Sequence, residues 1–144
     1  MTDVVVVGVD GSEDSLRALC WAAKEARIRG ARLRLVRAWS YADQPEGGFD
    51  PSYDEEAARR MLDESVSRLG TDSTGLEIER RVVCDLPARA LLDAAADADL
   101  LVVGSRGLGG FQGLLLGSVS QQVVHHAPCP IVIVPGAERS EAGS

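Results

Sequence analysis

The sequence lacks the features that would tie it to a membrane or to secretion. Its uninterrupted apolar runs, such as 100–103, are only a few residues long, far short of the roughly 20 residues that cross a bilayer. The valine run at 4–7 follows neither a basic segment nor a small-residue cleavage site, so we expect no secretory signal and a cytoplasmic location.

The sequence has few cysteines, and their spacing does not suggest that they pair. The three cysteines, Cys20, Cys84 and Cys129, are odd in number and widely spaced, with no C-x-x-C pair, which argues against a disulfide framework and against a zinc knuckle. A chain of 144 residues buries roughly 68–70% of the surface of its unfolded form. We therefore expect one domain that folds without disulfide bonds or a structural metal ion.

Basic residues are outnumbered, and lysine is almost absent. Fifteen Lys and Arg stand against 22 Asp and Glu, a formal net charge of −7. Nucleic-acid binding normally requires a clustered basic face, so DNA and RNA are not expected as partners. Lys24 is the only lysine, which excludes mechanisms that need a second one.

What the sequence does contain is an alternation of strand and helix patterns. Apolar or β-branched runs predict five strands, and amphipathic stretches with capping residues or proline at their starts predict four helices. In chain order they are a strand at 3–9, a helix at 13–29, a strand at 33–39, a helix at 53–69, a strand at 76–83, a helix from Pro87, a strand at 100–103, a helix opened by Ser118 and a strand at 131–134.

This order predicts an α/β fold, a single-domain open parallel five-stranded sheet with helices on both faces (Rossmann-like). The common strand order for such a sheet is 3-2-1-4-5. We expect the domain to occupy 1–135 and residues 136–144 to form a disordered tail.

Ligands of open parallel sheets bind at the carboxyl ends of the strands, where the winding direction reverses. In the expected order this point lies between the first and fourth strands. The polar turn at 10–12 follows the first strand and the glycine-rich stretch from 104 follows the fourth, so the two segments should meet there.

The glycine-rich stretch has a regular frame. Gly104 is followed by Gly107 after two residues and by Gly117-Ser118 after nine more, immediately before the last helix. Glycines let backbone amides approach an anion, and a helix amino end favours phosphate. A polyphosphate cradle is the chemical interpretation, and a merely flexible connection is the alternative. Arg106 is the only formally charged side chain between positions 99 and 138 when both histidines are neutral.

The combined motifs resemble the universal stress protein family, specifically its ATP-binding branch. They are the Gly-x-x-Gly, nine-residue, Gly-Ser frame, the opening Val-Gly-Val-Asp-Gly-Ser at 7–12 and the ending Ala-Pro-Cys-Pro-Ile-Val-Ile-Val at 127–134. The resemblance covers 4–134. It implies a homodimer in which each subunit binds ATP and in which the final strands, 131–134, often pair edge to edge. Magnesium is expected to accompany the ATP.

The resemblance also assigns site residues by position. It implies Gly8 and Asp10 on the ribose and adenine side, Ala38 against the adenine, and Val103 and Gly104 along the ribose. Around the phosphates it implies Arg106, Gly107, Gly117, Ser118, Val119 and Ser120.

Two of these residues have alternative roles. The Asp10 carboxylate can accept a hydrogen bond from a ribose hydroxyl, help to hold Mg²⁺, or only satisfy backbone amides at a turn. Ser118 begins an S-x-x-Q capping box, and capping of the helix is the alternative role for the hydroxyl that would otherwise contact the phosphates.

The leading hypothesis is an ATP-binding regulator of the stress response that acts as a switch through dimer or partner contacts. Slow or absent hydrolysis is expected, because the sequence lacks G-x-x-x-x-G-K-[ST]. An ATP-using enzyme of the pyrophosphatase and nucleotidyl transferase class is the alternative, since the stretch 10–15 resembles the S-G-G-x-D-S loop of that class. A phospho-acceptor receiver domain is excluded, because it needs a lysine near the fifth strand.

Overall fold

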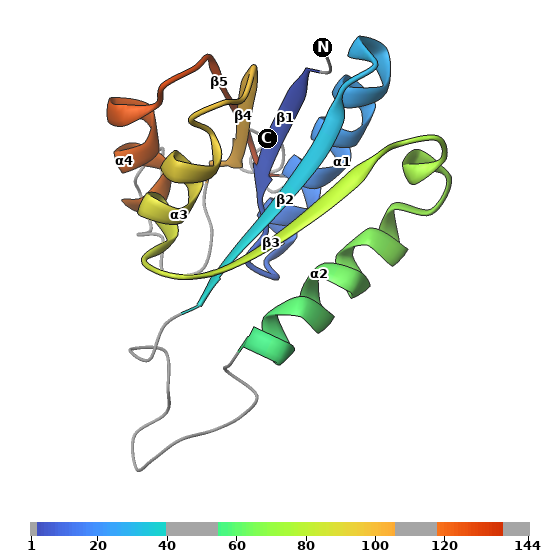
Figure 1. Ribbon diagram of the computed structural model, residues 1–144, viewed down its shortest axis with the longest axis horizontal. Helices are drawn as coiled ribbons and strands as arrows, with labels where there is room; N and C mark the ends of the chain where they lie inside the picture. The colour runs from blue at the N-terminus through green and yellow to red at the C-terminus, as the bar shows by residue number, and fades with distance from the viewer. Residues whose placement is uncertain (1–2, 40–54, 106–117, 137–144) are drawn as a thin grey trace, which may run out of the picture.

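A computed structural model of the protein describes residues 3–39, 55–105 and 118–136, and all that follows concerns those ranges (Figure 1). The strands are β1 (Val4–Gly8), β2 (Arg32–Trp39), β3 (Ile78–Cys84), β4 (Leu100–Gly104) and β5 (Ile131–Val134). The helices are α1 (Glu13–Arg29), α2 (Glu55–Leu69), α3 (Pro87–Ala94) and α4 (Ser118–His126), with a 3₁₀ turn, η3 (Gly70–Ser73), after α2.

The five strands form one parallel sheet in the order β3-β2-β1-β4-β5. Helices α1 and α2 cover one face, and α3 and α4 cover the other (Figure 1). The predicted fold class and strand order are thus confirmed.

β1 is the central strand, and its composition follows from its position. Val5 and Val7 belong to the core under α1 and α2, whereas Val4 and Val6 belong to the core under α3 and α4. A strand with helices on both faces has no side for polar residues. The continuous valine run is therefore the sequence signature of this position.

α1 begins and ends where its capping residues predict. The Ser12 hydroxyl oxygen accepts a hydrogen bond from the Ser15 backbone N–H at 3.1 Å, which satisfies one of the free donors of the first turn. Gly30 ends the helix at φ 67°, a left-handed conformation that glycine adopts without steric cost. The predicted range 13–29 is confirmed.

Some boundaries differ from the prediction. β3 begins at Ile78, two residues later than expected; η3 and a turn occupy 70–75, and residues 76–77 connect that turn to the strand. Ser118 is the first described residue of α4 rather than the residue before the helix, a one-residue difference that is common at helix ends. The predicted helix start at 53 and most of the predicted tail, 137–144, lie outside the described residues. No helix within the described ranges is long and apolar enough to cross a bilayer.

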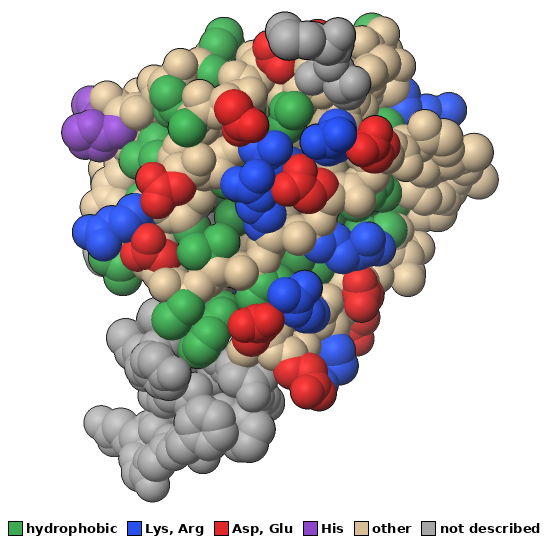
Figure 2. Space-filling view, viewed as in Figure 1, with side chains coloured by type: hydrophobic (Ala, Val, Ile, Leu, Met, Phe, Trp, Pro, Cys, Tyr) green, Lys and Arg blue, Asp and Glu red, His purple; other side chains and the backbone are tan. Residues whose placement is uncertain are grey.

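An arginine side chain lies buried on β2. The side chain of Arg34 is 3% exposed; its Nε donates to Glu79 Oε1 at 2.9 Å, and its Nη1 donates to Asp97 Oδ1 at 2.8 Å and to the Ala94 carbonyl at 2.7 Å. A buried charge is tolerated when it is paired and hydrogen-bonded. Acidic and basic side chains interleave over this part of the surface (Figure 2).

The pairing shifts the pKa values of all three partners. Burial raises the pKa of the Glu79 carboxyl, but the hydrogen bonds from Arg34 and Arg81 outweigh burial and hold that pKa below its ordinary value. The hydrogen bond from Arg34 lowers the pKa of Asp97. Burial opposes the charge of Arg34, but hydrogen bonds to Asp97 and Glu79 raise its pKa. Each of the three pKa shifts favours the charged form of its group, and therefore favours the ion pairs.

The carboxyl end of β4 touches the first turn of α1 without any intervening side chain. A Cβ on Gly104 would lie 2.9 Å from the Asp14 backbone oxygen and 3.1 Å from its carbonyl carbon. Such distances are closer than packed carbon atoms accept. Glycine at this position therefore sets how closely α1 approaches β4.

Glu79→Gln should reduce the free energy of unfolding at pH 7 by about 1–2 kcal/mol, because Arg34 loses a charged partner but keeps two acceptors. The lowered folded-state pKa means that this stabilisation is present above the unfolded pKa and is lost as the pH falls through the folded one. Urea unfolding at pH 7 and near pH 3 should show the variant and the wild type converging in acid.

The control for this variant is Glu77→Gln. The Glu77 side chain is 65% exposed and pairs with Arg32, so its loss should cost less than about 0.5 kcal/mol. Equal losses for the two variants would mean that burial of Arg34 contributes nothing.

Gly104→Ala should lower the free energy of unfolding by about 1–3 kcal/mol, since the new methyl group meets backbone atoms that cannot rotate away. Gly8→Ala is the matched control at the end of β1, where the nearest atoms, at 3.0 and 3.2 Å, are the terminal carbons of the Leu91 side chain. Chemical denaturation of both variants should show the larger loss for Gly104→Ala, and the reverse order would contradict the packing argument.

Candidate functional site

The carboxyl ends of β1 and β4 lie side by side at the centre of the sheet (Figure 1). β1 continues to α1 on one face, whereas β4 leads toward α4 on the other face. The winding direction reverses at this point, which is where open parallel sheets bind ligands. The structure thus brings together the turn at 10–12 and the start of the glycine-rich stretch, as the sequence predicted.

The turn after β1 is held by its own polar groups. Asp10 Oδ1 accepts hydrogen bonds from the Ser12 backbone N–H at 2.9 Å and from the Ser12 hydroxyl at 2.6 Å. Gly11 between them has φ 86°, which only glycine adopts readily. The turn-stabilising role considered for Asp10 is therefore present, and it fixes the carboxylate at the edge of the site.

The residues expected around the base and sugar lie on three neighbouring strands. Gly8 is half-buried, and Ala38 packs with Val83 against the core under α3. The Val103 side chain is 4% exposed and belongs to the same core, so Val103 can line a ligand only through its backbone.

The amino end of α4 is attached to the end of β4. The Ser120 hydroxyl donates to the Gly104 carbonyl oxygen at 2.7 Å, and Ser120 is 5% exposed. The free N–H groups and the positive dipole end of a helix favour an anion. This hydrogen bond therefore places an anion-favouring helix end beside the strand ends.

The expected phosphate-binding residues are only partly described. Val119 is half-buried in the first turn of α4, and Ser118 contributes its backbone to the start of that helix. Arg106, Gly107 and Gly117 lie outside the described residues. Their assignment to the phosphates remains a prediction.

Two residues that sequence reasoning did not select also belong to this region. Asp14 supplies the backbone oxygen that faces Gly104. Ser105 follows Gly104 and is 3% exposed, and its hydroxyl has no hydrogen-bond partner within the described ranges. A serine inside a glycine-rich motif carries no local signal of burial, so only packing could reveal it.

The described residues include no group of three His, Cys, Asp or Glu side chains placed to hold a metal ion. The Asp10 carboxylate lies just after the carboxyl end of β1. A carboxylate is a ligand that suits Mg²⁺.

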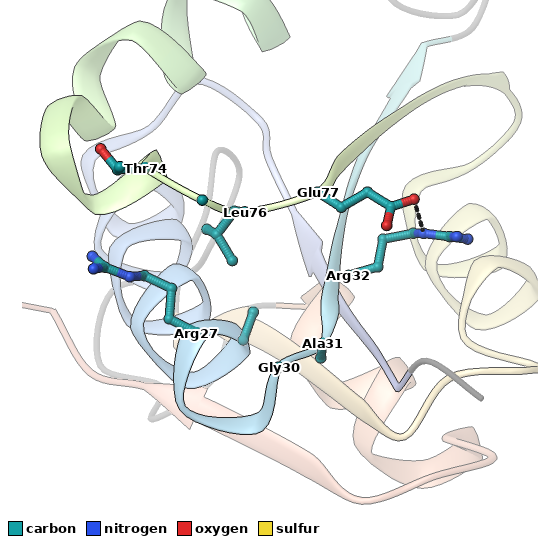
Figure 3. A pocket seen from close by; sticks show the side chains of 9 residues that line it. Arg27, Gly30, Ala31, Arg32, Thr74, Leu76 and Glu77 are labelled. Carbon is teal, nitrogen blue, oxygen red and sulfur yellow. Dashed lines mark hydrogen bonds and ion pairs between the residues drawn. The ribbon is translucent and has the colours of Figure 1, made fainter.

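A groove of about 370 Å³ lies at the opposite end of the sheet, beside the C-terminal end of α1 (Figure 3). Arg32 on its wall pairs with Glu77 at 2.9 Å, and Arg27 lies on the other side. The carbonyl end of a helix disfavours anions, and the basic side chain of Arg32 is already paired. This groove is not the candidate site.

Comparison with known proteins agrees with the geometry. The model of the Universal stress protein family matches residues 1–135. A universal stress protein of Mycobacterium tuberculosis is 42% identical over 130 residues, which are 90% of this chain and 44% of the relative; the chain thus spans about half the length of the mycobacterial relatives it matches. A universal stress protein of Thermus aquaticus is 40% identical over 139 residues, 93% of this chain and 99% of the relative.

Two similar solved structures hold nucleotides. The crystal structure of a universal stress protein in complex with cAMP is 36% identical, with a TM-score of 0.68 over 92% of this chain and 95% of that one. The universal stress protein from Archaeoglobus fulgidus in complex with dAMP is 28% identical, with a TM-score of 0.68 over 93% and 98% of the two chains. The family model covers nearly the whole sequence, and the aligned parts of these two relatives are about 40% identical to it, so the chain belongs to the universal stress protein family.

Proposed function

We propose that the chain is a cytoplasmic adenine-nucleotide-binding regulator that takes ATP with Mg²⁺ at the carboxyl ends of β1 and β4 and works as a homodimer. The observation that carries the proposal is that Gly104, at the end of β4, packs against the first turn of α1 just after the Asp10 turn and accepts a hydrogen bond from Ser120 at the amino end of α4. The similar structures with cAMP and dAMP support an adenine nucleotide as the ligand.

The proposal assigns binding rather than efficient hydrolysis to the chain. In P-loop enzymes a lysine at the β- and γ-phosphates supports phosphoryl transfer. The single lysine, Lys24, lies exposed on α1, two turns or more from the amino end of that helix. A nucleotide that binds without rapid turnover suits a protein that reports on nucleotide occupancy.

The two edges of the sheet differ in a way that favours pairing at β5. β3, at one edge, carries the charged side chains of Glu79, Arg80 and Arg81, and charged edges resist pairing. β5, at the other edge, consists of four half-buried apolar residues between two prolines. A second copy of the chain would therefore add at β5, extending the sheet.

The site and this edge are directly linked. Gly104 pairs with Val134 in the β4–β5 ladder, and the Ser105 backbone N–H donates to the Val134 carbonyl at 2.9 Å. If nucleotide binding shifts the end of β4, the backbone hydrogen bonds between β4 and β5 would transmit that shift directly to the edge strand. This connection is the proposed basis of the switch.

Calorimetric titration with ATP, AMP and adenosine, each with Mg²⁺ and with EDTA, tests the ligand assignment. ATP and AMP should bind, and adenosine should bind at least about tenfold more weakly, because it offers no anion to the helix end. The absence of binding heat for all three at millimolar concentration would refute the proposed function. Dependence of ATP affinity on Mg²⁺ would assign the metal role.

Ile133→Pro should convert the dimer to a monomer at micromolar concentration in sedimentation velocity. The Pro130 and Val134 carbonyls bond to β4, so alternation along a parallel ladder directs the Ile133 N–H to the free edge. Proline there removes an outward donor and leaves the ladder to β4 intact. Ile133→Ala, which keeps the N–H, is the control; a dimer that persists in the proline variant would exclude this edge.

A further inference from the structure

Ser105 holds a buried hydroxyl that the folded chain leaves without a partner. The residue is 3% exposed, and no donor or acceptor within the described residues reaches its Oγ. Its backbone N–H, in contrast, is used in the sheet, where it donates to the Val134 carbonyl. Buried polar atoms are rarely left unpaired, because desolvation of an unpaired group costs free energy. The hydroxyl is therefore the one group of this residue whose presence packing does not explain.

The direction of the Ser105 side chain follows from the ladder. Side chains alternate between the two faces of a strand, and the position of a Cβ on Gly104 points toward Asp14 of α1. The backbone stays paired with β5 at the next residue, so the Ser105 side chain points to the opposite face. That face carries α4, whose Ser120 donates to the Gly104 carbonyl oxygen. The Ser105 side chain thus lies on the face of the sheet to which the first turn of α4 is attached.

Ser120 provides an internal comparison. It is also a serine, it is 5% exposed, and it lies across the same strand end, yet its hydroxyl is satisfied by the Gly104 carbonyl. Two neighbouring buried serines therefore differ in one respect: the Ser120 hydroxyl joins two elements of the fold, and the Ser105 hydroxyl has no partner within the described residues.

The ligand group that suits this position is an anion. A serine hydroxyl donates readily to a charged oxygen, and such bonds are stronger than those between neutral groups. α4 has nine residues, and the N–H groups of its first turn favour the same charge. A donor at the strand end and donors at the helix end then face the same anion.

We propose that Ser105 binds the ligand, its hydroxyl donating to the phosphate that is attached to the nucleotide's sugar. The inference rests on the proposed nucleotide function and adds to it a residue and a chemical group. That phosphate is shared by AMP, cAMP and ATP, so Ser105 contributes to recognition of a sugar-linked phosphate whatever follows it. Adenosine, which lacks the group, gains nothing from Ser105.

Ser105→Ala tests the assignment by the opposite effects it should have on binding and stability. Affinity for AMP and ATP should fall about tenfold or more in calorimetry, and affinity for adenosine should not change. The urea midpoint of the nucleotide-free protein should stay equal or rise, because an unpaired polar group has been removed. Ser105→Cys keeps the side-chain shape but donates a hydrogen bond only weakly, so it should lose the same affinity for AMP and ATP. This loss would show that the effect of Ser105→Ala does not come from the smaller side-chain volume.

Ser120→Ala is the matched control, since it removes a satisfied hydroxyl and should lower the urea midpoint.

Wild-type affinity for AMP in both Ser105 variants would overturn the inference and leave the proposed function standing. A stability loss in Ser105→Ala equal to that of Ser120→Ala would show a structural hydroxyl and overturn it as well. Equal weakening of adenosine and AMP would overturn the phosphate assignment. A wild-type protein that binds none of the nucleotides would refute the proposed function and the inference with it.

Discussion

The structure depends on the point at which the end of β4 meets the first turn of α1. Gly104 has no Cβ, so the Asp14 carbonyl can occupy the space that a side chain would fill. The same residue accepts a hydrogen bond from Ser120 of α4 and pairs with Val134 of β5. One residue therefore fixes three elements relative to each other, and the candidate site is the space that they surround. Gly104 was expected because a ligand could approach its backbone closely, and the packing of α1 on β4 requires glycine at the same position.

Charged side chains are distributed unevenly over the sheet: they gather over β2 and β3 and are absent from the edge strand β5. On the α3 face, the part over β2 and β3 carries a buried arginine whose partners, Glu79 and Asp97, come from two different elements. These ion pairs join β2, β3 and the turn after α3 through polar contacts rather than apolar ones. The β5 edge, by contrast, offers only apolar side chains and backbone groups. The charged side chains of β3 oppose strand pairing at that edge, whereas β5 carries no such protection.

Much of the fold could be predicted from local patterns, because the physics is local. A run of β-branched residues covered on both faces, the Ser12 cap and the Gly30 end of α1 each follow from a few neighbouring residues. β3 was placed less well: its predicted first two residues, 76–77, lie in the connection from the preceding turn, and no strong local pattern marks where the strand begins. The buried state of Arg34 could not be predicted at all, since its partners lie 45 and 63 positions away.

The sequence by itself determined the alternation of elements, the strand order and the region in which polar turns and glycines would converge, because periodicity and the right-handed crossover leave few arrangements. It also identified Gly104 and Asp10 as residues of that region. Only the tertiary structure decided which polar groups are occupied: Asp10 in its own turn, Ser120 on the Gly104 carbonyl, and Ser105 without a described partner. The physical reason is that hydrogen-bond satisfaction depends on which elements pack together, and residues 104 and 120 meet only when α4 folds back onto the sheet.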